Sequence, residues 1–260
     1  MRSATREAHG ALIDAVSASS GAGVSDAREV LQAARAIERT PQLLAALVDT
    51  NGTSADRDAI IARVFGSLGA EARRLLGLAA AQRWSSGQDL LAGLEDAGIR
   101  IASTASDADV SGEIQQVERV VVGDTDLELA LGGLIGGPDD KALVVERLLA
   151  GKASEATLVI LDHLVRSPRG RRIGVLLRQA AESVAEAAGA GIATVTTAVA
   201  LPEAQLQRLE TSLSQRYGRR LLVQQVVDPQ IIGGLRVAVA DDVIDGTLRA
   251  KFTDLRLRLG

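Results

Sequence analysis

Apolar residues recur at helical spacing through the first two thirds of the chain, which predicts a series of amphipathic helices. Ser25 or Asp26 is expected to cap the second helix, Pro41 fits the first turn of the third, and Asn51-Gly52 is expected to end that helix. A polar linker is predicted at residues 103–109. The predicted helices cover residues 5–17, 26–40, 41–50, 55–65, 70–83, 87–94 and, in the last part of this region, 169–189.

Part of this pattern occurs twice, which indicates a duplicated helical module. Ten positions from Leu43 to Phe65, glycine and charged residues among them, recur further along the chain at the constant spacing that separates Arg57 from Lys141. A second set from Leu78 to Leu94 recurs at a spacing shorter by one position, the spacing that separates Leu78 from Leu161. The alternative, two unrelated bundles rich in Leu and Ala, stays open because these residues are common enough to align by accident.

After Gly191 the period changes from helical to alternating, which predicts a small domain with strands. Strands are expected at 192–199, 221–227 and 235–240, with a helix at 202–217 and a terminal helix at 247–259. Residues 243–245 are expected to form a short extended piece. The predicted fold class is therefore α+β, mainly α. We expect an N-terminal helical bundle at 1–102, a second bundle-like helical module at 103–190 and a small β-α-β-β-α domain at 191–260.

Composition narrows the class of partner. Only 2% of the 260 residues are aromatic and the net charge is −4, which disfavours stacking on bases and binding to nucleic acid. The chain has no Cys, so it has neither disulfides nor thiolate chemistry. No apolar signal core and no run of about 18 uncharged apolar residues is present, so direct membrane insertion is not expected.

No set of side chains with catalytic or ligand-binding spacing is visible, so we expect neither an enzyme nor a cofactor. His9 and His163 have no Cys or acidic partner at metal-ligand spacing, which makes a metal site improbable. The acidic residues around Asp245 are expected to cap turns and the last helix. Gly233-Gly234 follows a turn and does not open a helix, so it is interpreted as a structural turn and not as a phosphate cradle.

Two features are candidate interface elements. The first is the basic run from Arg166 to Arg172, which includes Arg169 and Arg171; it is either a solvated loop or a contact for an acidic protein surface. The second is Trp84, the only Trp, which is either an anchor of a loop in the core or an interface residue.

In the last 70 or so residues a predicted strand is followed by Asp228-Pro229 and Ile232-Gly233-Gly234, and a second strand leads to Ile244-Asp245-Gly246 and Thr247. This run resembles the C-terminal signature of the delta subunit of F-type ATP synthases, known in mitochondria as the oligomycin-sensitivity-conferring protein. Thr197 to Pro202 also fits the family pattern. The helical part matches loosely: residues 43–83 fit the second half of the family's six-helix bundle, and residues 109–189 are interpreted as an extra module, as in longer actinobacterial forms.

The resemblance implies a non-catalytic stator adaptor. In that family the helical domain holds the catalytic head through N-terminal segments of the alpha subunits, and the C-terminal domain binds the b-type stalk subunits. The expected location is the cytoplasmic side of the cell membrane, as a peripheral part of the complex. The alternative is a helical-repeat scaffold or a nucleic-acid-associated adaptor; the acidic charge and the few aromatics favour the stator.

Overall fold

The computed structural model describes residues 3–19, 21–50, 52–132, 136–218, 220–239 and 242–247. The chain divides into two compact units, residues 1–184 and 185–260, here called the helical unit and the C-terminal unit. The fold is mainly helical with a small mixed sheet, so the predicted α+β class is confirmed. The predicted boundary at residue 102 inside the helical unit stays a prediction.

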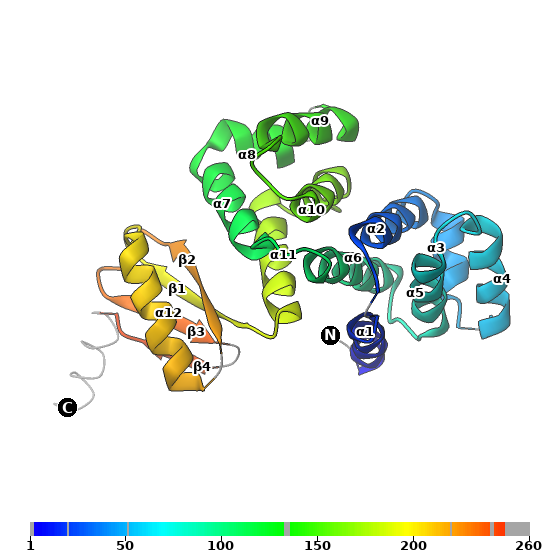
Figure 1. Ribbon diagram of the computed structural model, residues 1–260, viewed down its shortest axis with the longest axis horizontal. Coiled ribbons are helices and arrows are strands. Elements are labelled where there is room, and N and C mark those ends of the chain that lie inside the picture. The colour runs from blue at the N-terminus through cyan, green and yellow to red at the C-terminus, as the bar shows by residue number, and fades with distance from the viewer. Residues whose placement is uncertain are drawn as a thin grey trace. The chain divides into compact units, whose positions relative to one another are not determined.

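The helical unit contains the helices α1 to α10 and most of α11 (Figure 1). We call α1–α6 the first helical module and α7–α11 the second helical module. The bounds are α1 Ser3–Ser17, α2 Val24–Glu38, α3 Pro41–Val48, α4 Ser54–Val64, α5 Ala70–Ala81, α6 Gly87–Thr104, α7 Val110–Gly123, α8 Thr125–Gly132, α9 Pro138–Leu149, α10 Glu155–Arg166 and α11 Ile173–Ala187.

Three predicted helix ends are wrong. The N-cap of α2 is Gly23, and Asp26 lies one turn inside, where its carboxylate accepts the Gly23 N–H at 2.8 Å. Helix α3 ends at Val48 because Asp49 is already extended. Helix α6 continues past Leu94 to Thr104, and its buried residues include Gly98 and Ile101.

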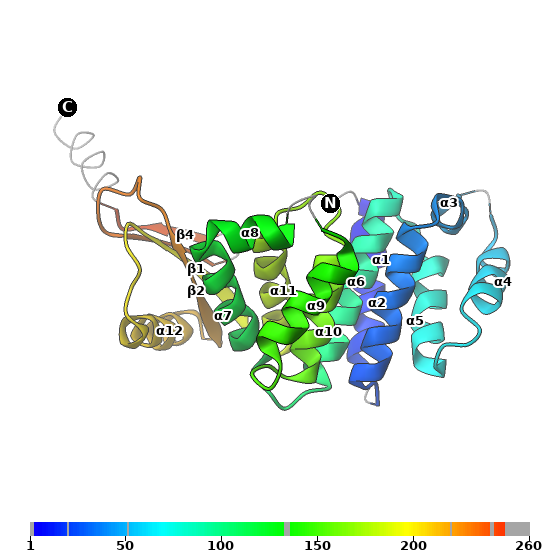
Figure 2. The same cartoon turned by 90° about the horizontal axis from the view of Figure 1, so that it is seen from above.

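Helix α6 is central to the helical unit. It packs against α1 and α2 of the first module and against α10 of the second (Figure 2). A helix that is apolar or small on most sides is expected in such a position, because it must be buried on more than one side. Gly98 allows this close packing, since an added Cβ there would lie 2.5 Å from Leu31 of α2.

The helices α2 to α6 are followed by five helices of similar length in the same order, α7 to α11. Helix starts are also capped alike. Asp56 accepts the Thr53 N–H at 3.0 Å, and its counterpart in the repeat, Asp140, accepts the Gly137 N–H at 3.2 Å. The duplication stays a prediction, and these repeated features support it.

A second repeated cap was not visible in the sequence. Glu29 of α2 accepts the N–H of Gly69 at the start of α5 at 2.6 Å. Glu113 of α7, which stands at the same spacing from Glu29 as Asp140 does from Asp56, accepts the N–H of Ser154 at the start of α10 at 3.0 Å. Carboxylates at equivalent positions thus stabilise equivalent helix starts in the two modules.

The structure changes one part of the predicted register. Helices α5 and α10 both have 12 residues, and aligning their first residues pairs Leu76 with Leu161, so the predicted pairing of Leu78 with Leu161 is wrong. The predicted spacing of the second set does describe α6 and α11. There the pairs Leu90/Ile173, Leu94/Leu177, Ala97/Ala180 and Ile101/Val184 are buried in both helices.

The C-terminal unit is a four-stranded sheet with one helix, α12 (Glu203–Tyr217), on one face (Figure 1). The strands are β1 Gly191–Thr197, β2 Leu221–Val227, β3 Leu235–Val239 and β4 Asp242–Asp245, in the order β2-β1-β3-β4. β1 and β2 are parallel, and the other pairs are antiparallel. Residues 243–245, predicted as a short extended piece, pair with β3 and belong to a fourth strand. The predicted terminal helix at 247–259 lies outside the described residues beyond Thr247.

Candidate functional site

The sequence motif of the C-terminal unit forms two turns, one between β2 and β3 and one after β4. Pro229 follows Asp228, whose N–H donates to Thr197 at 2.8 Å and whose carboxylate accepts the Gln230 N–H at 2.9 Å. Ile232 comes next and is 78% exposed. The segment therefore turns back on the sheet and leaves an apolar side chain in solvent.

Gly233 and Gly234 connect this turn to β3. Their φ angles are 127° and 81°, which only glycine adopts without strain. A Cβ on Gly234 would lie 2.4 Å from the carbonyl oxygen of Gly246, and the Gly246 N–H donates to Leu235 at 2.9 Å. The two parts of the sequence motif are therefore in contact in space.

The strand that precedes Gly246 is held at its end by a local cap. Ile244 of β4 pairs with Val237 of β3. The carboxylate of Asp245 accepts the Thr247 N–H at 3.0 Å. Hydrogen bonds from the side chain and the backbone of Thr247 lower the pKa of the Asp245 carboxyl. The motif residues thus build the turn architecture of the unit, and any contact with a partner stays a prediction.

Trp84 lies in the core of the first module. It is 6% exposed, and its Nε1–H donates to the carbonyl oxygen of Ala79 at 2.7 Å. Its ring lies against Gly93 of α6, where an added Cβ would be 2.4 Å from the ring. Of the two alternatives for Trp84, this position corresponds to a loop anchor.

The basic run after α10 is organised around one buried carboxylate, Glu95 of α6. Arg171 forms a two-pronged ion pair with Glu95 at 2.8 and 2.9 Å, and Arg169 contacts the same carboxylate at 2.6 Å. His163 of α10 contacts it at 3.1 Å. Arg169, with φ 49°, is a non-glycine residue in the left-handed region, and its side chain is 8% exposed. A solvated loop therefore does not describe Arg169 and Arg171.

The Glu95 carboxyl stays ionised despite its position. Burial raises its pKa, but hydrogen bonds from His163 and Arg171 and the charge of Arg169 outweigh burial and lower the pKa to about 2. This cluster links α6 to α10 and to the loop before α11. An ion pair of this kind is costly to break from one side, because the remaining charges stay buried.

The two ends of the basic run differ from its centre. Arg166 pairs with Asp162 at 2.6 Å and with Asp139 of α9, while Arg172 is exposed. Ser167 donates to Glu38 of α2. A contact of Arg166 or Arg172 with an acidic partner stays a prediction.

Both histidines have a carboxylate partner that sequence spacing did not reveal. His9 of α1 contacts Asp96 of α6 at 2.8 Å, and His163 contacts Glu95. The partners are 87 and 68 residues apart in sequence, so no local motif signals them. The described residues contain no group of three or more His, Asp or Glu side chains arranged to hold a metal ion.

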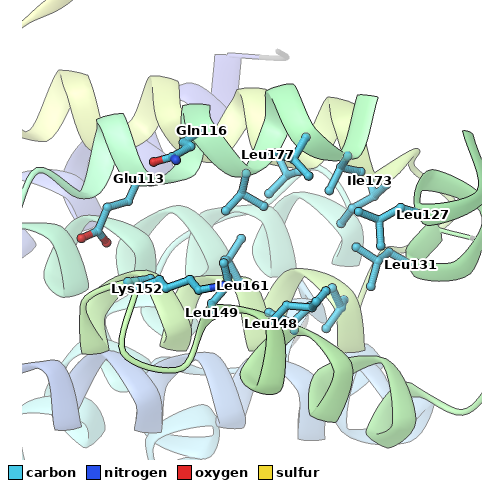
Figure 3. A pocket seen from close by; sticks show the side chains of 16 residues that line it. Glu113, Gln116, Leu127, Leu131, Leu148, Leu149, Lys152, Leu161, Ile173 and Leu177 are labelled. Carbon is cyan, nitrogen blue, oxygen red and sulfur yellow. The ribbon is translucent and has the colours of Figure 1, made fainter. Parts of the chain in front are cut away.

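An apolar groove of about 320 Å³ opens in the second module (Figure 3). Figure 3 shows Glu113 and Gln116 of α7 along one side, Leu148 and Lys152 along the other, and Leu127 of α8 at one end. The rest of the lining is aliphatic and comes from α7 to α11. Such a groove can bind apolar side chains.

None of the helices in the described part of the chain has the length and apolarity needed to span a lipid bilayer. The described residues combine a helical bundle with exposed apolar surface and a small α+β unit. This arrangement is typical of the class of proteins that act through contacts with other proteins.

Comparison with known proteins gives the particular family. The family model described as "ATP synthase delta (OSCP) subunit" matches residues 96–259. The ATP synthase subunit delta of Leifsonia xyli is 43% identical over the whole chain and 99% of its own length. That of Salinispora arenicola is 34% identical over 88% of this chain and 86% of its own length. The chain belongs to the ATP synthase delta (OSCP) subunit family.

The predicted family is thus confirmed, and with it a non-catalytic subunit of the membrane-bound ATP synthase. A chain in the solved structure titled "Cryo-EM structure of Toxoplasma gondii mitochondrial ATP synthase hexamer, composite model" is 15% identical, with a TM-score of 0.40 over 64% of this chain and 94% of its own length. This likeness is too low to define the fold.

The family match covers one of the two helical modules. It begins at residue 96, inside α6, and continues through the second module and the C-terminal unit. The assignment of residues 109–189 as the extra module stays a prediction.

Proposed function

We propose that this subunit is a stator adaptor of the ATP synthase on the cytoplasmic side of the membrane. Its helical unit holds the catalytic head through N-terminal segments of the alpha subunits, and its C-terminal unit binds the b-type stalk subunits. The observation that carries this proposal is membership of the delta family over the full chain. Rotation of the central shaft drives synthesis only if the head is held still, so the subunit needs durable protein contacts and no reactive group.

The repeated helices suggest where the head binds. Helix α6 is the counterpart of α1 in the repeat, because Gly87 follows Ser3 by the same number of residues as Lys141 follows Arg57. Helix α6 packs on α10, as α1 packs on α5. In the second module the α6/α10 face is covered by α2. Among the described helices only α6 makes substantial contact with both α1 and α5. The α1/α5 face thus lacks the covering helix that its counterpart has.

The chemistry of the α1/α5 face suits close approach of a helix. Ala4, Ala11 and Ala15 of α1 are exposed or half-buried, and the carbonyl oxygen of Ala15 accepts a hydrogen bond from Arg74 of α5 at 3.3 Å. This side of α1 therefore faces α5 and presents small residues. We propose that a helical segment of an alpha subunit docks on this face.

Matched variants on neighbouring residues test this surface. Ala11→Arg should weaken binding of the full chain to catalytic-head fragments at least tenfold, because the long charged side chain keeps a helix from approaching the face of small residues. Gly10→Arg adds the same charge on the other side of α1, where an added Cβ meets nothing within 4 Å, and should bind normally. The affinities are measured by titration calorimetry. Equal affinities of the two variants would contradict the proposed face.

Deletion of residues 191–260 tests the role of the C-terminal unit. The division of the chain near residue 185 leads us to expect that the helical unit keeps its circular dichroism and its affinity for the head. Binding to b-subunit fragments should be abolished. Retained binding to these fragments would show that the stalk contacts the helical unit.

A further inference from the structure

The second module exposes many apolar side chains on α7, α8 and α9. Six of its Val and Leu side chains between residues 120 and 148 are 44–63% exposed: Val120, Val122, Leu129, Leu143, Val144 and Leu148. Scattered apolar residues are normal on a surface, but a concentration of them next to a groove marks an interaction site. The groove beside Leu148 and Val120 makes this patch concave.

The first module differs from the second at one of these positions. The lining residues Leu131 and Val145 are buried, as are their counterparts Leu47 and Ile61, but Leu149 is half-buried whereas its counterpart Phe65 is 6% exposed. Phe65 and Trp84 add aromatic side chains to a buried core that extends through both modules. The second module has Leu149 in place of Phe65 and no aromatic residue between 110 and 184. Its interior is therefore left open by the choice of side chains.

The charges around the groove indicate the kind of partner. Residues 110–153 contain eight acidic and four basic side chains. Asp124 and Asp126, beside the Leu127 end, are exposed, while Glu113 and Lys152 lie together at the other end. A net acidic surface beside an apolar groove favours a partner with apolar residues on one side and cations on the flanks.

We propose that this groove, bounded by α7 and α9, binds a basic amphipathic helix of another subunit of the ATP synthase. The inference rests on the proposed function and adds a second docking surface, separate from the α1/α5 face. The partner helix lays its apolar side between Val120 and Leu148 and places Lys or Arg side chains near Asp124 and Asp126.

Single-cysteine variants provide the test, because the chain has no Cys of its own. Leu148→Cys places a thiol at the groove. Val64→Cys is its matched control, since Val64 is the counterpart of Leu148 in the first module, is 51% exposed against 50% for Leu148, and does not line the groove. Maleimide labelling rates are measured for both variants in the isolated subunit and in the assembled complex.

Both thiols should react readily in the isolated subunit. In the assembled complex Leu148→Cys should react at least tenfold more slowly, while the rate for Val64→Cys changes less than threefold. A photo-crosslinker attached at Leu148→Cys should then be recovered on a segment of another subunit with a net positive charge and helical apolar spacing.

Several results would overturn the inference. These are an unchanged labelling rate for Leu148→Cys in the complex, a crosslink within this chain or to a second copy of it, and a crosslink to an acidic segment. A variant that joins the complex but stays reactive contradicts this inference alone. Failure of both variants and the unmodified chain to join the complex contradicts the proposed function.

Discussion

The two helical modules contain the same order of helices but fill their interiors differently. In the first, the aromatic side chain of Phe65, which follows α4, and the ring of Trp84, which lies against α6, are buried. In the second, aliphatic side chains alone leave a groove of about 320 Å³. The loop after α5 is anchored by Trp84, and the loop after α10 is anchored by Arg169 and Arg171 on Glu95. On this helix scaffold a few side chains decide whether the interior holds aromatic rings or leaves a groove.

Removing the aromatic anchor should have the largest effect. We expect Trp84→Ala to lower the free energy of unfolding of the helical unit by about 3–5 kcal/mol, because it leaves a large cavity beside Gly93. Leu148→Ala, at the open groove, should cost less than about 1 kcal/mol. Urea unfolding followed by circular dichroism measures both, since Trp84 is the only Trp and its fluorescence is lost. Similar losses for the two variants would mean that the modules are closed alike.

Protonation of Glu95 tests the other anchor. Its pKa of about 2 in the folded chain lies below the unfolded value of about 4.5, so the unfolded chain binds more protons at acid pH. Its contribution, about 3 kcal/mol, is present above pH 4.5 and is lost as the pH falls toward 2. Glu95→Gln should remove this part of the acid dependence.

The control for Glu95 is an exposed acidic residue of the same unit. Glu146→Gln should leave the slope of stability against pH between 5 and 2 nearly unchanged. Stability is measured by urea unfolding at each pH. A wild-type slope in the Glu95→Gln variant would show that the cluster does not carry the ionised carboxylate described above.

The sequence predicted the helices better than the features that distinguish the modules. Apolar spacing and helix-ending glycines are local, so most helices, and the strand from Leu221 to Val227, were predicted within a few residues. The extension of α6 was missed because Glu95, Asp96 and Arg100 interrupt the apolar pattern. Each is held by partners that include charged side chains, and those of Glu95 are 68 to 76 residues away in sequence. Periodicity cannot reveal such pairs.

The hydrophobic pattern of the sequence could not predict the groove either, for a physical reason. Leu149 and Phe65 are both apolar at equivalent positions, so a hydrophobic pattern treats them as the same. The difference is volume, which matters only once the neighbouring helices are in place. The family motif was found because its glycines and Asp-Pro turn are local requirements of backbone geometry.

Exchanging the two residues tests the comparison with the smallest expected effect. Leu149→Phe adds a ring to the groove and should raise the free energy of unfolding by about 0.5–1 kcal/mol, since it buries apolar area in space that is now open. The reverse change, Phe65→Leu, should lower it by about 1 kcal/mol, because it removes buried apolar atoms and leaves a cavity. Both are measured by urea unfolding. If Leu149→Phe destabilises the chain as much as Phe65→Leu does, the groove is already filled as tightly as the first module, and the contrast between the modules must lie in their surfaces alone.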